Sequence, residues 1–157
     1  MALQVGDKIP NFSAKDSNGN NFDSSSVIGI KPVVLYFYPK DNTPGCTAQA
    51  CSFRDQYEDF KDLGAEVIGI SSDSVQSHEK FAKRYKLPFM LLSDNDKKLR
   101  NLFGVQSSLF GFLPGRVTYV ADDTGVIQLI FDSVMATSHI PRALKIIKKI
   151  ASEKESK

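Results

Sequence analysis

Hydrophobic positions along the chain form short continuous runs that alternate with longer amphipathic stretches. The run Val-Val-Leu-Tyr-Phe-Tyr at 33–38 is β-branched and aromatic throughout, which is typical of a strand buried on both faces of a sheet. In the stretch after it, 46–63, apolar residues recur every three or four positions: Cys46, Ala50, Phe53, Tyr57 and Phe60. This spacing predicts a helix with one buried face, and Gly64 would end it.

The rest of the chain repeats this alternation of strand-like and helix-like stretches. We predict further strands at 66–70, 89–92, 116–120 and 126–131, and further helices at 77–85, 95–103 and 138–151. Ser74 is a predicted cap for the first of these helices. A hairpin turn is expected at 122–125. Near the N-terminus, the pair Asn18-Gly19 predicts a tight hairpin between two short strands.

The order of these elements indicates a mixed sheet. Two strands joined by a helix are expected to pair in parallel, whereas the two strands of the late hairpin pair antiparallel. We therefore predict an α/β protein of thioredoxin-like fold, with a mixed central sheet, helices on both faces and an N-terminal β extension. A length of 157 residues suits one domain, so we assign 1–157 to a single domain with a flexible polar tail at 152–157.

Composition and charge narrow the classes of function. The chain is 41% hydrophobic and 24% charged, as in soluble globular proteins, and its formal net charge of +2 gives no reason to expect nucleic acid or a membrane as a partner. No apolar run is long enough to span a bilayer, and the N-terminus lacks the pattern of a secretory signal. We expect a cytoplasmic protein, or a plastid protein whose transit peptide has been removed.

The two cysteines are the candidate chemistry. Cys46 and Cys51 are too few for a four-thiolate zinc site, and neither His78 nor His139 has metal-ligand spacing to them. We therefore expect no metal and no cofactor, and we interpret both histidines as structural or exposed. Cys46 lies in the first turn of a predicted helix, where unpaired N–H groups and the helix dipole favour a thiolate. The alternative is a core cysteine on the apolar stripe.

The spacing of the two cysteines limits how they could react with each other. Residues five apart differ by about 140° around a helix and by about 7.5 Å along its axis, which is beyond the reach of a disulfide. Cys46 and Cys51 therefore cannot bond while the helix is intact, and pairing would require local unwinding. Cys51 falls off the apolar stripe, so it is either a partner thiol for Cys46 or a half-exposed bystander.

A segment in the first half of the chain resembles the active site of the peroxiredoxins: Tyr-Pro-Lys-Asp-Asn-Thr-Pro-Gly-Cys-Thr-Ala-Gln-Ala-Cys-Ser-Phe-Arg-Asp. It contains the Pro-x-x-x-Thr-x-x-Cys pattern of that family at Pro39, Thr43 and Cys46. The Thr-Pro-Gly-Cys-Thr-x-x-Ala-Cys form is similar to the peroxiredoxin Q, or bacterioferritin comigratory protein, group. The likeness continues through Leu113–Arg116 to the last helix. Gln49 stands where many members have Glu, a departure that we expect to matter little.

The resemblance implies a thiol peroxidase with a division of roles among five residues. Cys46 would be the peroxidatic cysteine, whose thiolate attacks a hydroperoxide and becomes a sulfenic acid. Thr43 would hydrogen-bond the peroxide oxygens, Arg116 would bring its guanidinium beside the sulfur, and Pro39 would shield the sulfur from water. Cys51 would resolve the sulfenic acid as an intramolecular disulfide, which thioredoxin or a similar dithiol protein would reduce. The family likeness also implies a monomer.

Other functions stay open on the residues alone. A thioredoxin-like thiol:disulfide oxidoreductase is disfavoured because the chain has no Cys-x-x-Cys pair. A redox sensor or holdase would use oxidation of Cys46 without turnover, and a structural module would not need Cys46 at all. Without the resemblance, Thr43 fits a helix cap, Arg116 a surface charge and Pro39 a strand terminator.

Overall fold

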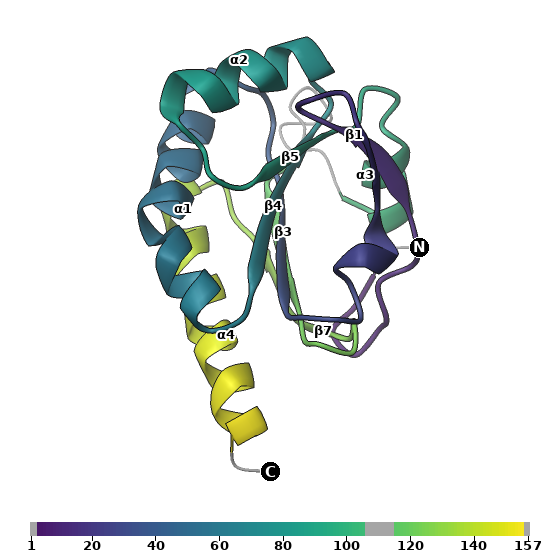
Figure 1. The fold of residues 1–157 in the computed structure, drawn as a ribbon, viewed down its shortest axis with the longest axis vertical. Helices are drawn as coiled ribbons and strands as arrows, with labels where there is room; N and C mark the ends of the chain where they lie inside the picture. Colours follow the sequence, from purple (N-terminus) through teal and green to yellow (C-terminus); the bar gives the residue numbers. More distant parts are fainter. Residues whose placement is uncertain (1–2, 106–114, 156–157) are drawn as a thin grey trace.

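The core of the fold is a mixed sheet (Figure 1). The computed structural model describes residues 3–105 and 115–155, and within them seven strands are ordered β2-β1-β5-β4-β3-β6-β7. The strands are β1 (Ser13–Asp16), β2 (Asn21–Asp23), β3 (Val33–Phe37), β4 (Glu66–Ser71), β5 (Met90–Ser93), β6 (Val117–Ala121) and β7 (Ile127–Asp132). The central strands β3, β4 and β5 pair in parallel, whereas the other pairings are antiparallel. The predicted mixed sheet is confirmed.

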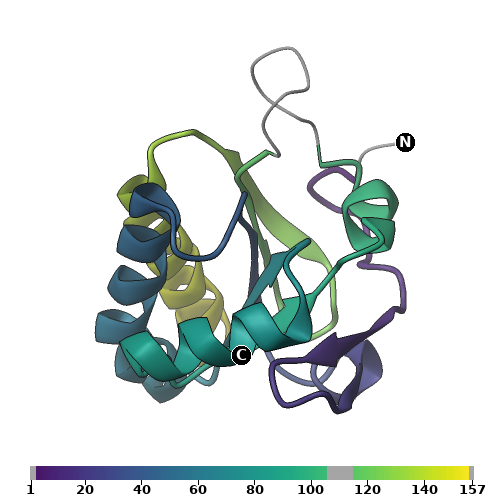
Figure 2. The same ribbon diagram turned by 90° about the horizontal axis from the view of Figure 1, so that it is seen from above.

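Helices cover both faces of this sheet, as predicted (Figure 1 and Figure 2). They are α1 (Pro44–Asp62), α2 (Val75–Tyr85), α3 (Lys98–Phe103) and α4 (His139–Glu155), with short 3-10 helices η1 (Ser24–Ser26) and η2 (Ala136–Ser138). α1 and α4 lie on one face, whereas α3 lies on the other with the N-terminal segment. Among the described helices, none has the length and apolar character needed to cross a bilayer.

Strand β3 is buried on both faces, as its uninterrupted apolar run predicts. Val34 and Tyr36 contribute to the core beneath α1 and α4, whereas Val33, Leu35 and Phe37 contribute to the core on the opposite face. All five side chains are inaccessible to solvent. Because side chains alternate along a strand, one continuous apolar run anchors both layers. The carboxyl end of β3 is therefore a fixed point from which the following loop begins.

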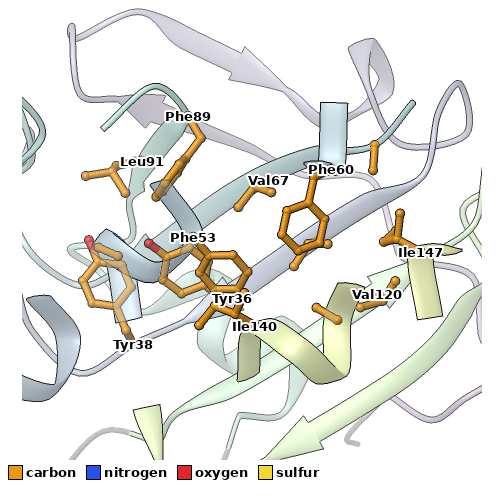
Figure 3. Packing of buried hydrophobic residues seen from close by; sticks show 14 of the residues in the cluster. Tyr36, Tyr38, Phe53, Phe60, Val67, Phe89, Leu91, Val120, Ile140 and Ile147 are labelled. Carbon is orange, nitrogen blue, oxygen red and sulfur yellow. The ribbon is translucent and has the colours of Figure 1, made fainter. Parts of the chain in front are cut away.

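Stacked aromatic rings fix α1 against this strand (Figure 3). The ring of Tyr36 on β3 stacks on Phe53 of α1, with centroids 4.5 Å apart, and on Tyr38 at 5.4 Å. Gly69 on β4 leaves the space that Tyr36 occupies, because a Cβ atom there would lie 2.8 Å from the Tyr36 hydroxyl and from Leu91. Such ring pairs contribute about 0.5–1.5 kcal/mol beyond their buried area. The start of α1 is thus placed by the core.

Helix boundaries differ from the prediction at several helix ends. α1 begins at Pro44, two residues early, because proline suits the first position of a helix. α3 begins at Lys98, since the N–H of Lys97 donates to the carbonyl of Asp94 and closes a turn ahead of the helix. α4 continues to Glu155, through residues assigned to a polar tail, because Glu and Lys are good helix formers.

Candidate active site

Cys46 lies in the first turn of α1, directly after the loop that leaves β3. Its side chain is only 1% exposed and belongs to the core beneath α1. The helix is capped by Thr43 in extended conformation, with Pro44 in its first turn. N–H groups in this turn have no helical carbonyl to bond, and the helix dipole is positive here. The sulfur therefore lies where negative charge is stabilised.

Arg116 reaches this sulfur from the opposite half of the sequence. β6 pairs antiparallel with β3, and Val117 lies opposite Phe37, so the residue before Val117 emerges beside the end of β3. The Nη2 atom of Arg116 donates to the Sγ atom of Cys46 at 3.4 Å. Strand pairing thus brings a cation to a thiol 70 positions away in sequence. In the Leu113–Arg116 motif, 113 and 114 lie outside the described residues.

Gly45 leaves room for the Arg116 guanidinium. A Cβ atom at position 45 would lie 3.1 Å from Nη2 of Arg116 and 3.9 Å from Cβ of Ala136. A separation of 3.1 Å is tighter than almost all real contacts of a Cβ atom. The small residue before Cys46 therefore favours the close approach of Arg116 to the sulfur.

Gln49 holds the other side of Arg116. Its side chain is fully buried, and its Oε1 atom accepts a hydrogen bond from Nη1 of Arg116. Its Nε2 atom has no hydrogen-bond partner within the residues that the structure describes. The expectation that this position matters little overlooked this contact. The signal was present, because residues three apart on a helix share a face, which places Gln49 beside Cys46.

Thr43 and Pro39 lie in the loop between β3 and α1, shortly before Cys46 in the chain. The hydroxyl of Thr43 donates to the carbonyl of Lys40 at 2.8 Å and makes no side-chain cap to α1. Because that hydroxyl has only one hydrogen, its oxygen can meet a further partner only as an acceptor. Pro39 is half-buried and directly follows Tyr38. Asn42 has a positive φ of 64°, a backbone conformation that asparagine tolerates better than most residues.

Cys51 lies further along the same helix and is half-exposed, and both cysteines are free thiols. The stripe predicted for this helix is buried at Cys46, Ala50, Phe53 and Phe60. Cys51 lies off that stripe, as expected from its spacing. The structure therefore brings Cys46 together with Arg116 and Gln49, and it leaves Cys51 on the side of α1 nearer to solvent.

Comparison with known proteins identifies the family. The family model described as AhpC/TSA family matches residues 5–130. The chain belongs to the AhpC/TSA family. Its relatives include the chloroplastic peroxiredoxin Q of Triticum aestivum, 56% identical and covering 94% of this chain and 68% of that protein. The chloroplastic peroxiredoxin Q of Sedum lineare is 54% identical and covers 92% and 78% of the two chains. The chain is thus a peroxiredoxin of the Q group, and an oxidoreductase that acts on peroxides.

Solved structures agree with this assignment. A peroxidoxin, BcpB of Mycobacterium tuberculosis, has a TM-score of 0.87 and 34% identity, covering 94% of this chain and 98% of that one. The peroxiredoxin Q of Xanthomonas campestris has a TM-score of 0.81 and 30% identity, covering 89% and 91%. A mutant of PrxQ from Xylella fastidiosa has a TM-score of 0.88 and 28% identity, covering 96% and 99%. The predicted thioredoxin-like fold is confirmed.

A buried hydrogen-bond network supports the loop between β3 and α1 of this peroxiredoxin. His78 on α2 is fully buried, with Nε2 2.9 Å from the carbonyl of Leu92 and Nδ1 2.7 Å from Oδ2 of Asp41. The hydroxyl of Tyr38 donates to the other oxygen of Asp41 at 2.6 Å. Since the carbonyl only accepts, Nε2 carries a hydrogen, and a further hydrogen lies between His78 and Asp41. The loop residue Asp41 is thereby fixed to α2.

The same network contains the group in the described residues that has the geometry to hold a metal ion. Asp41, Asp73 and His78 offer ligand atoms within 4.8 Å of one another. These atoms already have protein partners, since Oδ2 of Asp73 accepts from the N–H of Asp41 at 2.8 Å and from the Ser71 hydroxyl at 2.6 Å. Hydrogen bonds within the protein therefore explain why these three side chains lie close together. His78 is structural, as interpreted, but sequence spacing gave no sign of Asp41, which lies 37 positions earlier.

His139 fixes the segment between β7 and α4. Its Nδ1 atom lies 2.7 Å from the hydroxyl of Thr118 on β6, and its Nε2 atom lies 2.8 Å from the carbonyl of Ser133. This arrangement suits the neutral ring, with Nε2 donating and Nδ1 accepting. Burial lowers the pKa of His139, and the charge of Arg116 acts in the same direction. The N–H of Ser133 also donates to the carbonyl of Arg116, the residue just before β6. By holding Ser133, His139 therefore helps to fix the backbone at Arg116.

Proposed function

We propose that this peroxiredoxin reduces hydroperoxides through the sulfur of Cys46. The contact between Nη2 of Arg116 and Sγ of Cys46, 3.4 Å long and located at the amino end of α1, carries the proposal. A fixed cation and unpaired amides stabilise a thiolate, which is the reactive form of cysteine. Their preorganised dipoles also stabilise the charge that develops on the peroxide as it reacts.

The chemical step is a displacement at oxygen. The Cys46 thiolate attacks the terminal oxygen of the hydroperoxide, forming an S–O bond while the O–O bond breaks. The sulfur is oxidised to a sulfenic acid, and the other oxygen leaves as water or an alcohol after taking up a proton. Negative charge moves from the sulfur to the leaving oxygen, and the Arg116 guanidinium, with several donors on one plane, can contact both.

Thr43 and Pro39 would prepare the substrate side of this step. Because the single hydroxyl hydrogen of Thr43 is donated to the carbonyl of Lys40, its oxygen is free to accept the O–H of the peroxide. The N–H of Cys46 would donate to the peroxide oxygens from the helix terminus. Pro39, half-buried beside the loop, would keep water away from the sulfur. Both hydrogen peroxide and organic hydroperoxides present the O–O end that this arrangement handles.

Cys51 would complete the cycle as the resolving thiol. Its sulfur attacks the sulfenic sulfur of Cys46, so that an S–S bond forms and water leaves. A dithiol protein such as thioredoxin would then reduce the disulfide by exchange. Because both thiols lie on α1 five positions apart, bonding requires the helix to unwind locally. Resolution within one chain needs no second subunit, which supports a monomer.

The relatives support a location different from our first expectation. Those from Triticum aestivum and Sedum lineare are named chloroplastic. We therefore favour the plastid alternative over the cytoplasm for this peroxiredoxin. Residues 1–157 are proposed to act as one domain.

A coupled peroxidase assay with two cysteine variants tests the proposal. With thioredoxin and its reductase present, Cys46→Ser is expected to abolish turnover, because serine does not supply a thiolate. Cys51→Ser is expected to react once with peroxide and then stop, because the sulfenic acid has no resolving partner. Turnover that persists in Cys46→Ser would refute the assignment of the nucleophile. Sustained thioredoxin-dependent turnover in Cys51→Ser would refute only the resolving role.

A further inference from the structure

We propose that Arg100 is a positioning residue of the peroxide site, whose buried guanidinium joins the strand end before Pro39 to the strand start that carries Arg116. The inference rests on the proposed roles of Cys46 and Arg116. Arg100 lies on α3, and no motif of the sequence points to it. Its helix α3 lies on the face of the sheet opposite to α1, as Figure 2 shows.

Two hydrogen bonds carry the inference. Nη2 of Arg100 donates to the carbonyl of Tyr38 at 2.6 Å, and Nη1 donates to the carbonyl of Gly115 at 3.1 Å. Tyr38 is the last residue before the loop that begins at Pro39, and Gly115 directly precedes Arg116. One planar group therefore spans the two chain segments that present the nucleophile and its cation. A guanidinium suits this role because its donors are held in a rigid fork.

Arg100 is itself held firmly. The carboxylate of Asp94 accepts from the N–H of Leu99 at 2.8 Å and from the N–H of Arg100 at 2.9 Å, which anchors the start of α3. The guanidinium carbon lies 5.8 Å from the centre of the Phe37 ring on β3. The residue is only 6% exposed. The guanidinium therefore contacts the two carbonyls from a fixed position, which it needs in order to position the chain segments of the site.

The charge of Arg100 also belongs to the site. Burial lowers the pKa of Arg100, whereas Asp94 and then the Cys46 sulfur act to raise it. Arginine nevertheless remains cationic in proteins, so Arg100 contributes a second positive charge that acts on the Cys46 sulfur. Its Nε atom has no hydrogen-bond partner in the part of the chain that the structure describes. The terminal nitrogens, and not Nε, therefore link the protein segments.

Loss of this link would move the reacting groups relative to each other. The Arg116–Cys46 contact joins two chain segments, and Arg100 ties the same two segments together from the opposite face of the sheet. A misplacement of about 1 Å can cost up to roughly 100-fold in rate. We therefore expect the rate constant of Cys46 with hydrogen peroxide to fall, although the Cys46 thiolate still forms.

The experiment compares two reactions of the same thiol. In the Cys51→Ser background, the rate constant of Cys46 with hydrogen peroxide is divided by its rate constant with iodoacetamide at the same pH. Both reactions need a folded protein and a thiolate, so changes in stability or ionisation cancel in the ratio. Only the peroxide reaction needs donors aligned with oxygen. A purely structural role for Arg100 would not lower the rate constant with hydrogen peroxide while leaving the rate constant with iodoacetamide unchanged.

Three substitutions decide the outcome. Arg100→Met should lower the ratio by roughly 10- to 100-fold, because both carbonyl contacts are lost. Arg100→Lys keeps the charge but reaches one carbonyl, so it should lower the ratio by about tenfold, the effect of one lost hydrogen bond to a charged group. Arg142→Met is the control, because Arg142 also lies over a phenylalanine ring, Phe131 at 4.7 Å, but on α4. Its ratio should equal that of the parent.

A ratio for Arg100→Lys within about twofold of the parent would overturn the inference, whether or not Arg100→Met folds, because the lost carbonyl contact alone is expected to cost more. A ratio within about twofold of the parent in a folded Arg100→Met variant would also overturn the inference, by itself. Failure of the proposed function has a different signature, since Cys46→Ser would then retain turnover. The two failures are therefore distinguishable.

Discussion

At the scale of single residues, the approach of Arg116 to the sulfur depends on the absence of a side chain at position 45. Gly45→Ala would place a methyl group 3.1 Å from Nη2 of Arg116 and push the guanidinium away from Cys46. We expect the rate constant with hydrogen peroxide to fall by about tenfold, the scale of one weakened hydrogen bond to a charged group. The measurement is the single-turnover oxidation of Cys46.

Stability provides the control for this substitution. Replacing glycine by alanine inside a helix normally stabilises by about 0.5–1 kcal/mol. The urea midpoint of Gly45→Ala should therefore be no lower than that of the parent, even though its peroxide reaction is slower. An unchanged peroxide rate would show that the guanidinium can shift without loss.

Single residues also show how far sequence reasoning reached. Cys46 was singled out by its place in the first turn of a predicted helix, whereas the roles of Thr43 and Pro39 were predicted from the resemblance of their segment to a family. Arg116 was found only through the resemblance to a family, since its proximity to the sulfur depends on the pairing of β3 with β6.

Arg100 and the Asp41–His78 pair were not found at all. Folding brings their partners close: the two carbonyls that Arg100 contacts are 15 and 62 positions away, and Asp41 is 37 positions from His78. A backbone carbonyl exists at every position of any sequence, so no residue pattern can indicate which one a buried arginine will contact.

At the scale of elements, α1 holds both thiols, so its integrity should change during the cycle. The proposed disulfide between Cys46 and Cys51 would require about one and a half helical turns to unwind. We expect the oxidised protein to have less helix than the reduced protein by far-UV circular dichroism.

Cys51→Ser is the matched control for this measurement. Treated with the same peroxide, it cannot form the disulfide and should keep the spectrum of the reduced protein. Identical spectra for the reduced and oxidised parent protein would contradict local unwinding.

Among the elements, those with a strong period were predicted best. The short β-branched and aromatic run of β3, bounded by prolines, favours a strand, and the 3.6-residue period of the apolar positions in α1 favours a helix. The start of α3 was predicted three residues early, since the backbone carbonyl of Asp94 closes a turn with the N–H of Lys97 ahead of the helix. Residues in such a turn show no hydrophobic pattern that would separate them from the helix that follows.

At the scale of the whole molecule, His139 connects stability to pH. Burial lowers its pKa below the ordinary value of 6.5. As the pH falls below that value, the unfolded chain takes up a proton on this residue before the folded protein does. The free energy of unfolding contributed by the neutral ring is therefore present above 6.5 and is lost as the pH falls through the folded-state pKa.

Urea unfolding of His139→Gln tests this dependence. Glutamine can still donate to the carbonyl of Ser133 but does not titrate, so its stability should decline less than that of the parent between about pH 7.5 and about pH 5.5. Equal declines in the two proteins would show that His139 does not contribute. The other titrating groups are common to both proteins and cancel in the comparison.

The stack of Tyr36 on Phe53 has a practical consequence. The chain has five tyrosines and no tryptophan, so tyrosine dominates its near-ultraviolet signal. One ring of the stack belongs to the rigid strand β3, and the other belongs to the helix that carries both thiols. A disturbance that travels along α1 as far as Phe53 would change the asymmetric surroundings of Tyr36. The native chain thus contains its own optical label for the catalytic cycle, without any dye attached.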